Sequence, residues 1–316
     1  MTTPESSHNS FKNIPPGSRV PPELARDLLE AAKSAPREAS QASQSERRDQ
    51  GVVSPREALE IMGEQDFIGP DQLKSIFGRE VADVPPIPFS AQELREAKER
   101  GEFLILRTDS LGDAKDLTMQ NLHAYFEGDF KMLASATDQW KLDSNFFTKE
   151  TPEVSWALVS KDFIPNTTSK NYFEQTRSIV AHLKDTVYQG GTPPAKYQEA
   201  IDEFEAYSAG TFPGKSPQEI QTEIGGTKWK QYAEQLSKLK INQLCRQSAV
   251  EALFDIAVYY KHTNRKLLES PYTWTKSRAS DGRLGLVGFA GAAGAHVGRW
   301  GPGNSDGVLG VLLSRR

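Results

Sequence analysis

The sequence predicts an α+β fold, with helices through the middle of the chain and short strands at its carboxy-terminal end. Apolar residues recur at helical spacing in 171–188, 195–207 and 241–260. After Ser277, glycine becomes frequent, which favours turns and short strands over helix. Together these patterns indicate short antiparallel strands with flanking helices.

Composition narrows the class of protein. The chain has 316 residues, of which 37% are hydrophobic and 25% charged, as in a soluble globular protein with room for two domains. Lys+Arg 38 against Asp+Glu 42 gives a net charge of -4, so no basic field is available for nucleic acid. Cys245 is the single cysteine, which excludes an internal disulfide and any paired-cysteine metal or redox centre.

Targeting signals are not expected. The amino terminus has no basic region followed by an apolar run, so the predicted location is cytoplasmic. The longest weakly polar run, 284–298, is shorter than the roughly 20 residues that cross a bilayer. Arg283 and Arg299 flank this run, and no membrane partner is predicted.

The amino-terminal part divides into two predicted segments. Residues 1–52 are poor in apolar residues and predict a mostly disordered arm, with one short helical pattern at 22–33. Residues 53–84 predict a small helical segment with helices at Pro55–Met62 and Pro70–Phe77. Each of these helices begins with proline.

The predicted main domain spans 85–316, after a stiff proline-rich connection at 84–89. A capping-box pattern at 90–93 starts a helix, and buried strands are predicted at 103–107 and 154–159. The helix at 241–260 is the most hydrophobic, so Cys245 is expected to be a buried apolar residue and no nucleophile. Further strands are predicted near 283–289, 295–300 and 308–313, with Phe289 and Trp300 among their anchors.

The carboxy-terminal region contains several distinctive motifs. They are Tyr272–Arg278, Asp281-Gly-Arg283, Val287-Gly-Phe289, Val297–Trp300 and Leu309–Arg315. These motifs resemble the variable proteins of diversity-generating retroelements. The ending also resembles the formylglycine-generating-enzyme (sulfatase-modifying-factor) branch of the C-type lectin fold. The resemblance covers 272–316 well, the preceding elements loosely and residues 1–80 hardly at all.

The resemblance implies a C-type-lectin-like domain at 85–316 with a variable region at 272–316. Because the ends of that fold meet, the strand at 103–107 should pair with the strand at 308–313. In such systems a reverse transcriptase makes errors at template adenines, so codons without adenine are preserved. The scaffold positions implied here are Trp274, Gly288, Phe289, Val297, Trp300, Leu309 and Gly310.

From Ala279 onward, the residues between these scaffold positions all belong to the set reachable from an asparagine codon. The implied variable, ligand-binding positions are Ala279, Asp281, Arg283, Gly285, Ala290, Ala292, Ala293, His296, Gly298, Arg299, Gly301, Gly303, Asn304 and Ser305. Side chains expected to contact the ligand are Arg283, His296, Arg299, Asn304 and Asp306. The expected ligand is an unknown protein or small molecule.

No catalytic activity, cofactor or metal site is expected. Enzymes of this fold branch hold copper through two cysteines, and no cysteine lies in the terminal region. The calcium signatures Glu-Pro-Asn and Trp-Asn-Asp do not occur, although Asp281, Asn304 and Asp306 could supply oxygens. The alternatives are a formylglycine-generating-enzyme-like protein or remnant, a structural scaffold protein, and a glycine-rich β terminus without diversification.

Overall fold

The computed structural model describes the chain in several stretches. These are residues 52–111, 115–127, 138–210 and 215–316. The unit spanning Val52–Arg316 is compact. Apart from Val52, the predicted arm and its helix at 22–33 lie outside the described residues. No helix in the described stretches is long and apolar enough to span a bilayer.

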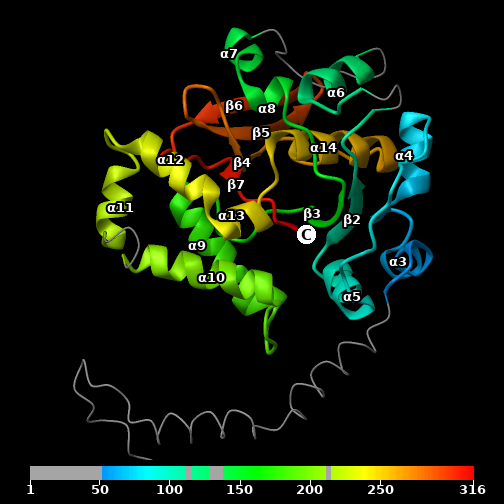
Figure 1. The fold of residues 1–316 in the computed structure, drawn as a ribbon, viewed down its shortest axis with the longest axis horizontal. Coiled ribbons are helices and arrows are strands. Elements are labelled where there is room, and N and C mark those ends of the chain that lie inside the picture. The colour runs from blue at the N-terminus through cyan, green and yellow to red at the C-terminus, as the bar shows by residue number, and fades with distance from the viewer. Residues whose placement is uncertain (1–51, 112–114, 128–137, 211–214) are drawn as a thin grey trace, which may run out of the picture. The chain divides into compact units, whose positions relative to one another are not determined.

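The first sheet contains the long strands of the amino-terminal half (Figure 1). Its order is β1 (Phe67–Ile68), β2 (Glu102–Arg107), β3 (Ser155–Ser160) and β8 (Ser314–Arg315). Strand β1 is parallel to β2, whereas β3 is antiparallel to both β2 and β8. All of β2 is buried, as its continuous apolar run predicts.

Short helices precede and flank this sheet. Their bounds are α3 (Pro55–Met62), α4 (Pro70–Phe77), α5 (Ala91–Glu99), α6 (Met119–Phe126), α7 (Gln139–Leu142) and α8 (Asn145–Thr148). The first three confirm the predicted helices, including the capping box of Ser90 and Glu93 that starts α5. Helices α3 and α4 bury Met62, Leu73 and Phe77 in the core that also contains β2 and β3. The predicted segment 53–84 and the region after it therefore share one core.

A second group of helices shares another core with the carboxy-terminal strands. Their bounds are α9 (Tyr172–His182), the π-helical turn η1 (Leu183–Val187), α10 (Ala195–Ser208), α11 (Pro217–Glu223), α12 (Trp229–Lys238) and α13 (Lys240–Cys245). Helix α9 with η1 confirms the prediction at 171–188, and α10 confirms the one at 195–207.

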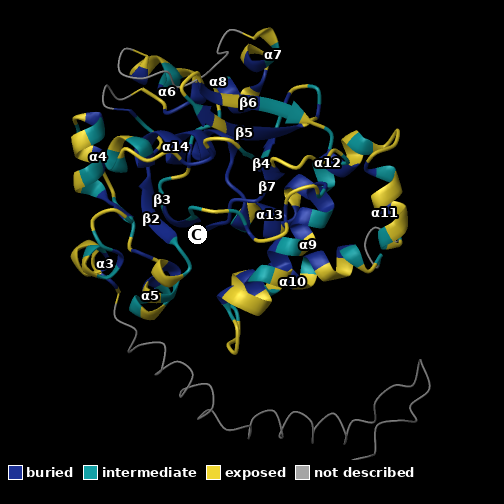
Figure 2. Ribbon diagram, turned by 180° about the vertical axis from the view of Figure 1, so that it is seen from behind, coloured by how far each residue is buried: buried dark blue, intermediate teal, exposed yellow. Residues whose placement is uncertain are grey.

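Helix α14 (Ala249–Thr263) is central to the fold and is buried throughout Ala249–Tyr259 (Figure 2). The prediction of one helix at 241–260 is wrong, because the backbone is extended at Arg246 (φ -112°, ψ 143°). A new helix then starts at a capping box. The Ser248 hydroxyl accepts from the Glu251 N–H at 3.2 Å, and the Glu251 carboxylate accepts from the Ser248 N–H at 2.7 Å.

The second sheet has the order β6 (Gly294–Trp300), β5 (Leu284–Gly291), β4 (Tyr272–Arg278) and β7 (Leu309–Gly310). Strands β5 and β6 confirm those predicted near 283–289 and 295–300. Strands β4 and β5 contact α14, which covers one side of this sheet. Strand β6 forms an edge of the sheet.

The end of the chain differs from the prediction. The single strand predicted at 308–313 is wrong, because β7 ends at Gly310 and residues 311–313 cross to the first sheet. The predicted pairing of this strand with 103–107 is also wrong, since β3 lies between β2 and β8. Side chains nevertheless meet across the sheet, where Arg315 forms a 2.7 Å ion pair with Glu102.

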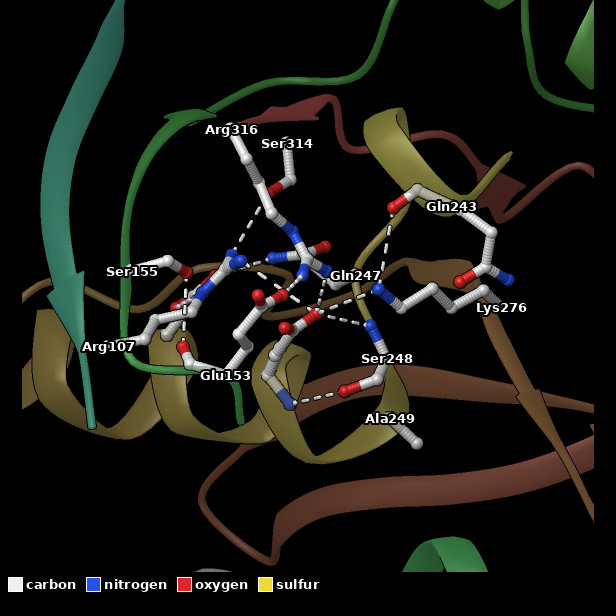
Figure 3. Close-up of polar contacts among 12 residues, drawn as sticks. Arg107, Glu153, Ser155, Gln243, Gln247, Ser248, Ala249, Lys276, Ser314 and Arg316 are labelled. Atoms are coloured by element: carbon white, nitrogen blue, oxygen red, sulfur yellow. Dashed lines mark hydrogen bonds and ion pairs between the residues drawn. The ribbon is translucent and has the colours of Figure 1, made fainter. Parts of the chain in front are cut away.

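Arg107, at the end of β2, is fully buried in a cluster of charged residues (Figure 3). Its Nε and Nη2 donate to the two carboxylate oxygens of Asp255 in α14, at 3.0 and 2.5 Å. Its Nη2 also donates to the Ser314 hydroxyl at 3.0 Å. This bidentate pair ties the first sheet to α14 and to the end of the chain.

Glu251 is the second acid of the cluster. Its Oε2 accepts from Arg316 Nη2 at 2.9 Å and lies 3.8 Å from both Arg107 Nη1 and Lys276 Nζ. Figure 3 shows these three cationic side chains pointing toward one another from separate elements. Burial opposes the Glu251 charge, but attraction to the three cations outweighs it and lowers the pKa of Glu251 to about 2.

Replacing Asp255 with Ala should lower the free energy of unfolding by about 3–5 kcal/mol, because Arg107 would stay buried without its bidentate partner. Urea unfolding near neutral pH measures this change. The double variant Arg107→Met, Asp255→Leu removes both charges and should recover most of the loss. As a control, Glu60→Ala breaks the exposed Arg56–Glu60 pair and should change stability by less than about 0.5 kcal/mol. A loss below about 1 kcal/mol for Asp255→Ala would contradict the expectation.

Acid should weaken the fold through Glu251. The pKa of Glu251 is about 2 in the folded protein and roughly 4.3 in an unfolded chain. Its contribution to the free energy of unfolding is therefore complete above about pH 4.3 and is lost as the pH falls toward 2. Glu251→Gln removes the charge but keeps an acceptor for the Ser248 N–H. Its deficit in unfolding free energy should be largest near pH 7 and should shrink below about pH 4.3. Urea unfolding across this range tests the expectation, which a pH-independent deficit would refute.

Candidate ligand-binding face

We call residues 279–308, at the edge and ends of the second sheet, the carboxy-terminal face. Among the predicted ligand-binding positions, the exposed ones are Arg283, Ala292, Ala293, His296, Asn304 and Ser305. The partly buried ones are Asp281, Gly298, Arg299, Gly301 and Gly303. The buried ones are Ala279, Gly285 and Ala290. The exposed and partly buried residues can therefore contact a ligand directly, whereas the buried ones cannot.

These positions lie at both ends of the β5–β6 hairpin and, for Gly285, Ala290, His296, Gly298 and Arg299, within its strands. The pairing runs from Leu284 opposite Trp300 to Gly291 opposite Gly294. Residues 279–283 and the loop after Trp300 lie at the first end, whereas Ala292 and Ala293 form the turn at the second. At about 3.3 Å per residue, β5 separates the two ends by more than about 20 Å. The structure therefore groups most of the predicted positions but leaves the alanine turn apart.

Charged side chains meet at the first end of the hairpin. The Asp281 carboxylate lies 2.8 Å from Arg299 Nη1 and 3.5 Å from Arg283 Nη1. The Arg299 guanidinium also lies over the Trp140 ring of α7, 4.5 Å from its centroid. Arg299 is thus held by an acid and an aromatic ring, so Arg283, the more exposed of the two arginines, is better placed to meet a ligand.

A cavity of about 300 Å³ lies beside this charged group. It is lined by Ile224, Gly225, Trp229, Arg283, Gly301, Gly303 and Asn304. Four of these residues were predicted from the sequence, and the structure brings them together. No helix was predicted at 229–238, so the contribution of α12 through Trp229 was missed.

The glycines of this face differ in the room around them. A Cβ at Gly303 would lie 2.7 Å from the Gly225 Cα and 2.9 Å from the Ile224 carbonyl, both backbone atoms. At Gly298 the nearest atom is the end of the Leu286 side chain, which can rotate away. A side chain is therefore easier to place at 298 than at 303.

An apolar cleft of about 230 Å³ opens on the same sheet. It is lined by Tyr272, Leu286, Phe289, Trp300, Asp306, Val308 and Leu309. Phe289, Trp300 and Val308 are 39%, 37% and 41% exposed. The predicted anchors Phe289 and Trp300 each pack against a neighbouring aromatic ring, but more than a third of each residue is exposed at this cleft. Composition does not reveal which face of a short strand an aromatic side chain occupies.

Oxygen ligands do not converge on a cation site in the described stretches. Asp281 is paired with arginines, and Asp306 Oδ1 accepts the Val308 N–H at 2.9 Å. Within those stretches, no cluster of three or more His, Cys, Asp or Glu side chains is arranged to hold a metal ion.

A third cavity, of about 270 Å³, gathers titratable groups away from this face. Its lining includes Arg100, Glu102, Asp162 and His182. Burial is the main cause that lowers the pKa of His182. Glu102, however, uses one oxygen for Arg100 and the other for Arg315, each at 2.7 Å. This carboxylate therefore joins structural elements and is poorly placed to act as a general base.

Cys245 is the remaining candidate for covalent chemistry. Its side chain is buried in α13, and burial raises the pKa of the thiol to about 12. The reactive thiolate form is therefore scarce at neutral pH.

No family model, curated protein or solved structure matches this chain.

Substitution with asparagine should distinguish positions that have space for a side chain from positions that do not. Gly303→Asn should destabilise the protein by about 1–3 kcal/mol, since its Cβ meets backbone atoms that cannot rotate away. Ala293→Asn, on the exposed turn, should stay within about 0.5 kcal/mol of the parent. Thermal and urea unfolding of both variants measure the difference. Equal stability of the two variants would show that the backbone near Gly225 yields freely.

Proposed function

We propose that the carboxy-terminal face binds a protein or small-molecule ligand and performs no catalytic step. The observation that supports this most directly is the exposed apolar group of Phe289, Trp300 and Val308 around one cleft. Large exposed apolar patches often mark binding sites, and here three apolar side chains are each more than a third exposed around one cleft. The cleft lies on a sheet supported by α14, so the side chains start from a rigid base.

We further propose that this face belongs to a C-type-lectin-like scaffold diversified by a retroelement. Two small sheets, with a last strand that returns to the sheet of the first long strand, are consistent with such a scaffold. The exposed positions His296, Asn304 and Ser305 could accept other side chains without touching either core. Binding would then need no cofactor, and its specificity would depend on the residues at the rim.

The competing proposal is an enzyme or enzyme remnant of the formylglycine-generating type. The observation in its favour is the cavity that contains Arg100, Asp162 and His182. The ion pairs of Glu102 make this cavity a weaker candidate than the aromatic cleft, and Cys245, whose thiol has a high pKa, does not line it. A scaffold role would instead require another subunit to cover Phe289 and Trp300.

Sequencing the DNA around the gene tests diversification directly. We expect a near-copy of the codons for 272–316 beside a reverse-transcriptase gene, differing almost only where the copy has adenine. Among gene variants that yield folded protein, substitutions should gather at His296, Asn304 and Ser305 and be rare at Gly303. If no copy is present, the face has a fixed sequence and a dedicated ligand becomes the better proposal.

A further inference from the structure

The apolar cleft lined by Tyr272, Phe289 and Trp300, here called the aromatic cleft, differs in composition from the charged end of the face. We propose that it binds a small organic cation with a quaternary ammonium head group. This inference deepens the proposed binding function and rests on it. It assigns ligand recognition to Phe289 and Trp300, which the sequence pattern placed in the scaffold.

Three aromatic rings line the cleft. The Tyr272 and Phe289 rings lie 4.9 Å apart between centroids and are inclined by 33°. Trp300 meets the buried Trp274 nearly edge-on at 6.4 Å, so its ring is supported from the sheet side. Aromatic faces carry negative charge density, and grouped rings are a known means of holding ammonium groups. Because the Tyr272 and Phe289 rings pack against each other, the aromatic surface available to a cation consists of their faces turned away from this contact and the exposed Trp300 ring.

Asp306 adds a negative charge to the lining of the cleft. Its Oδ1 accepts the Val308 N–H at 2.9 Å, which orients the carboxylate. The arginines at the charged end, Arg283 and Arg299, are matched with a different acid, Asp281. The lining of the cleft thus contains one acidic residue and no basic one, a charge pattern suited to a cationic ligand.

The size and floor of the cleft narrow the choice of cation. A volume of about 230 Å³ is below the roughly 300–1,000 Å³ of pockets for drug-sized ligands, so one head group fits better than a large molecule. Leu286, Val308 and Leu309 supply an apolar surface. N-methyl groups can contact that surface, whereas a bare ammonium would lose its hydration there.

The backbone at Phe289 supports a binding role over a packing role. Its φ of +50° lies in the left-handed region, which bulky residues rarely adopt. The strand pairing shifts register between Gly288 and Gly291, and the Phe289 N–H is held by the Pro271 carbonyl at 3.0 Å. Glycine would relieve this strain, yet position 289 holds a phenylalanine that is 39% exposed and belongs to neither buried core. Strained residues of this kind gather at functional sites.

The test compares choline with 3,3-dimethylbutan-1-ol, which has the same shape but no charge. Both are titrated into the full chain while NMR follows the indole N–H resonances, with that of Trp300 assigned by its loss in Trp300→Leu. We expect choline to saturate the Trp300 shift with an affinity about tenfold higher than that of the neutral alcohol. Equal affinity for the two compounds, or no saturable shift with choline, would overturn the proposal.

Variants provide the matched controls. Trp300→Leu and Asp306→Asn should each weaken choline binding several-fold, detected by the broadening of choline signals, whereas Tyr125→Leu should not. Tyr125 is 38% exposed and lies outside the cleft, and Asp306→Asn retains an acceptor for the Val308 N–H. Unchanged binding in both cleft variants would refute the assignment.

Tenfold tighter binding of a trimethyl-lysine peptide than of choline would refute a small-molecule ligand. A template copy in the DNA would uphold the proposed function even if choline fails to bind.

Discussion

The buried pair of Arg107 and Asp255 is the constraint on which the arrangement of this fold depends. The Arg107 guanidinium is buried against the Asp255 carboxylate and the Ser314 hydroxyl, and this geometry limits how β2 and α14 can approach each other. The same cluster binds Ser314 and Arg316, which holds the end of the chain at the first sheet. Residues 311–313 therefore cross between the sheets, from β7 beside β4 to β8 beside β3.

Local sequence signals predicted the helices well where the cap residues were recognised. Proline and glycine marked the bounds of α4, and the capping box at Ser90 marked the start of α5. The helix break at Arg246 was missed because the apolar spacing continues across it, although Ser248 and Glu251 form the same type of box. Pairing of the last strand was missed for another reason, since its partner strand β3 and the ion pairs of Arg315 and Arg316 involve residues far apart in the sequence.

Composition predicted which segment would be unusual, but it could not predict which residues would meet. The glycine-rich stretch does form a hairpin and loops, and Arg283 and Asn304 do line one cavity. Ala279, just after β4, and Ala290, in β5, are buried, and the sequence did not reveal this because a small apolar residue gives no sign of the side it faces. The close approach of Gly303 to Gly225 involves a separate helix end, which no pattern within 272–316 contains.

Under the proposed function, recognition is divided between two kinds of residue. The rings of Phe289 and Trp300 stand on the β5–β6 hairpin, whose shape is constrained by close backbone contacts. A Cβ at Gly288 would lie 2.1 Å from the Pro271 carbonyl oxygen, so the backbone beside Phe289 tolerates no larger residue. His296 pairs with Gly288 across the hairpin and is exposed, so its side chain can vary without altering that approach. The constant rings of Phe289 and Trp300 could therefore supply affinity for the ligand, while variable residues beside them, such as His296, supply selectivity.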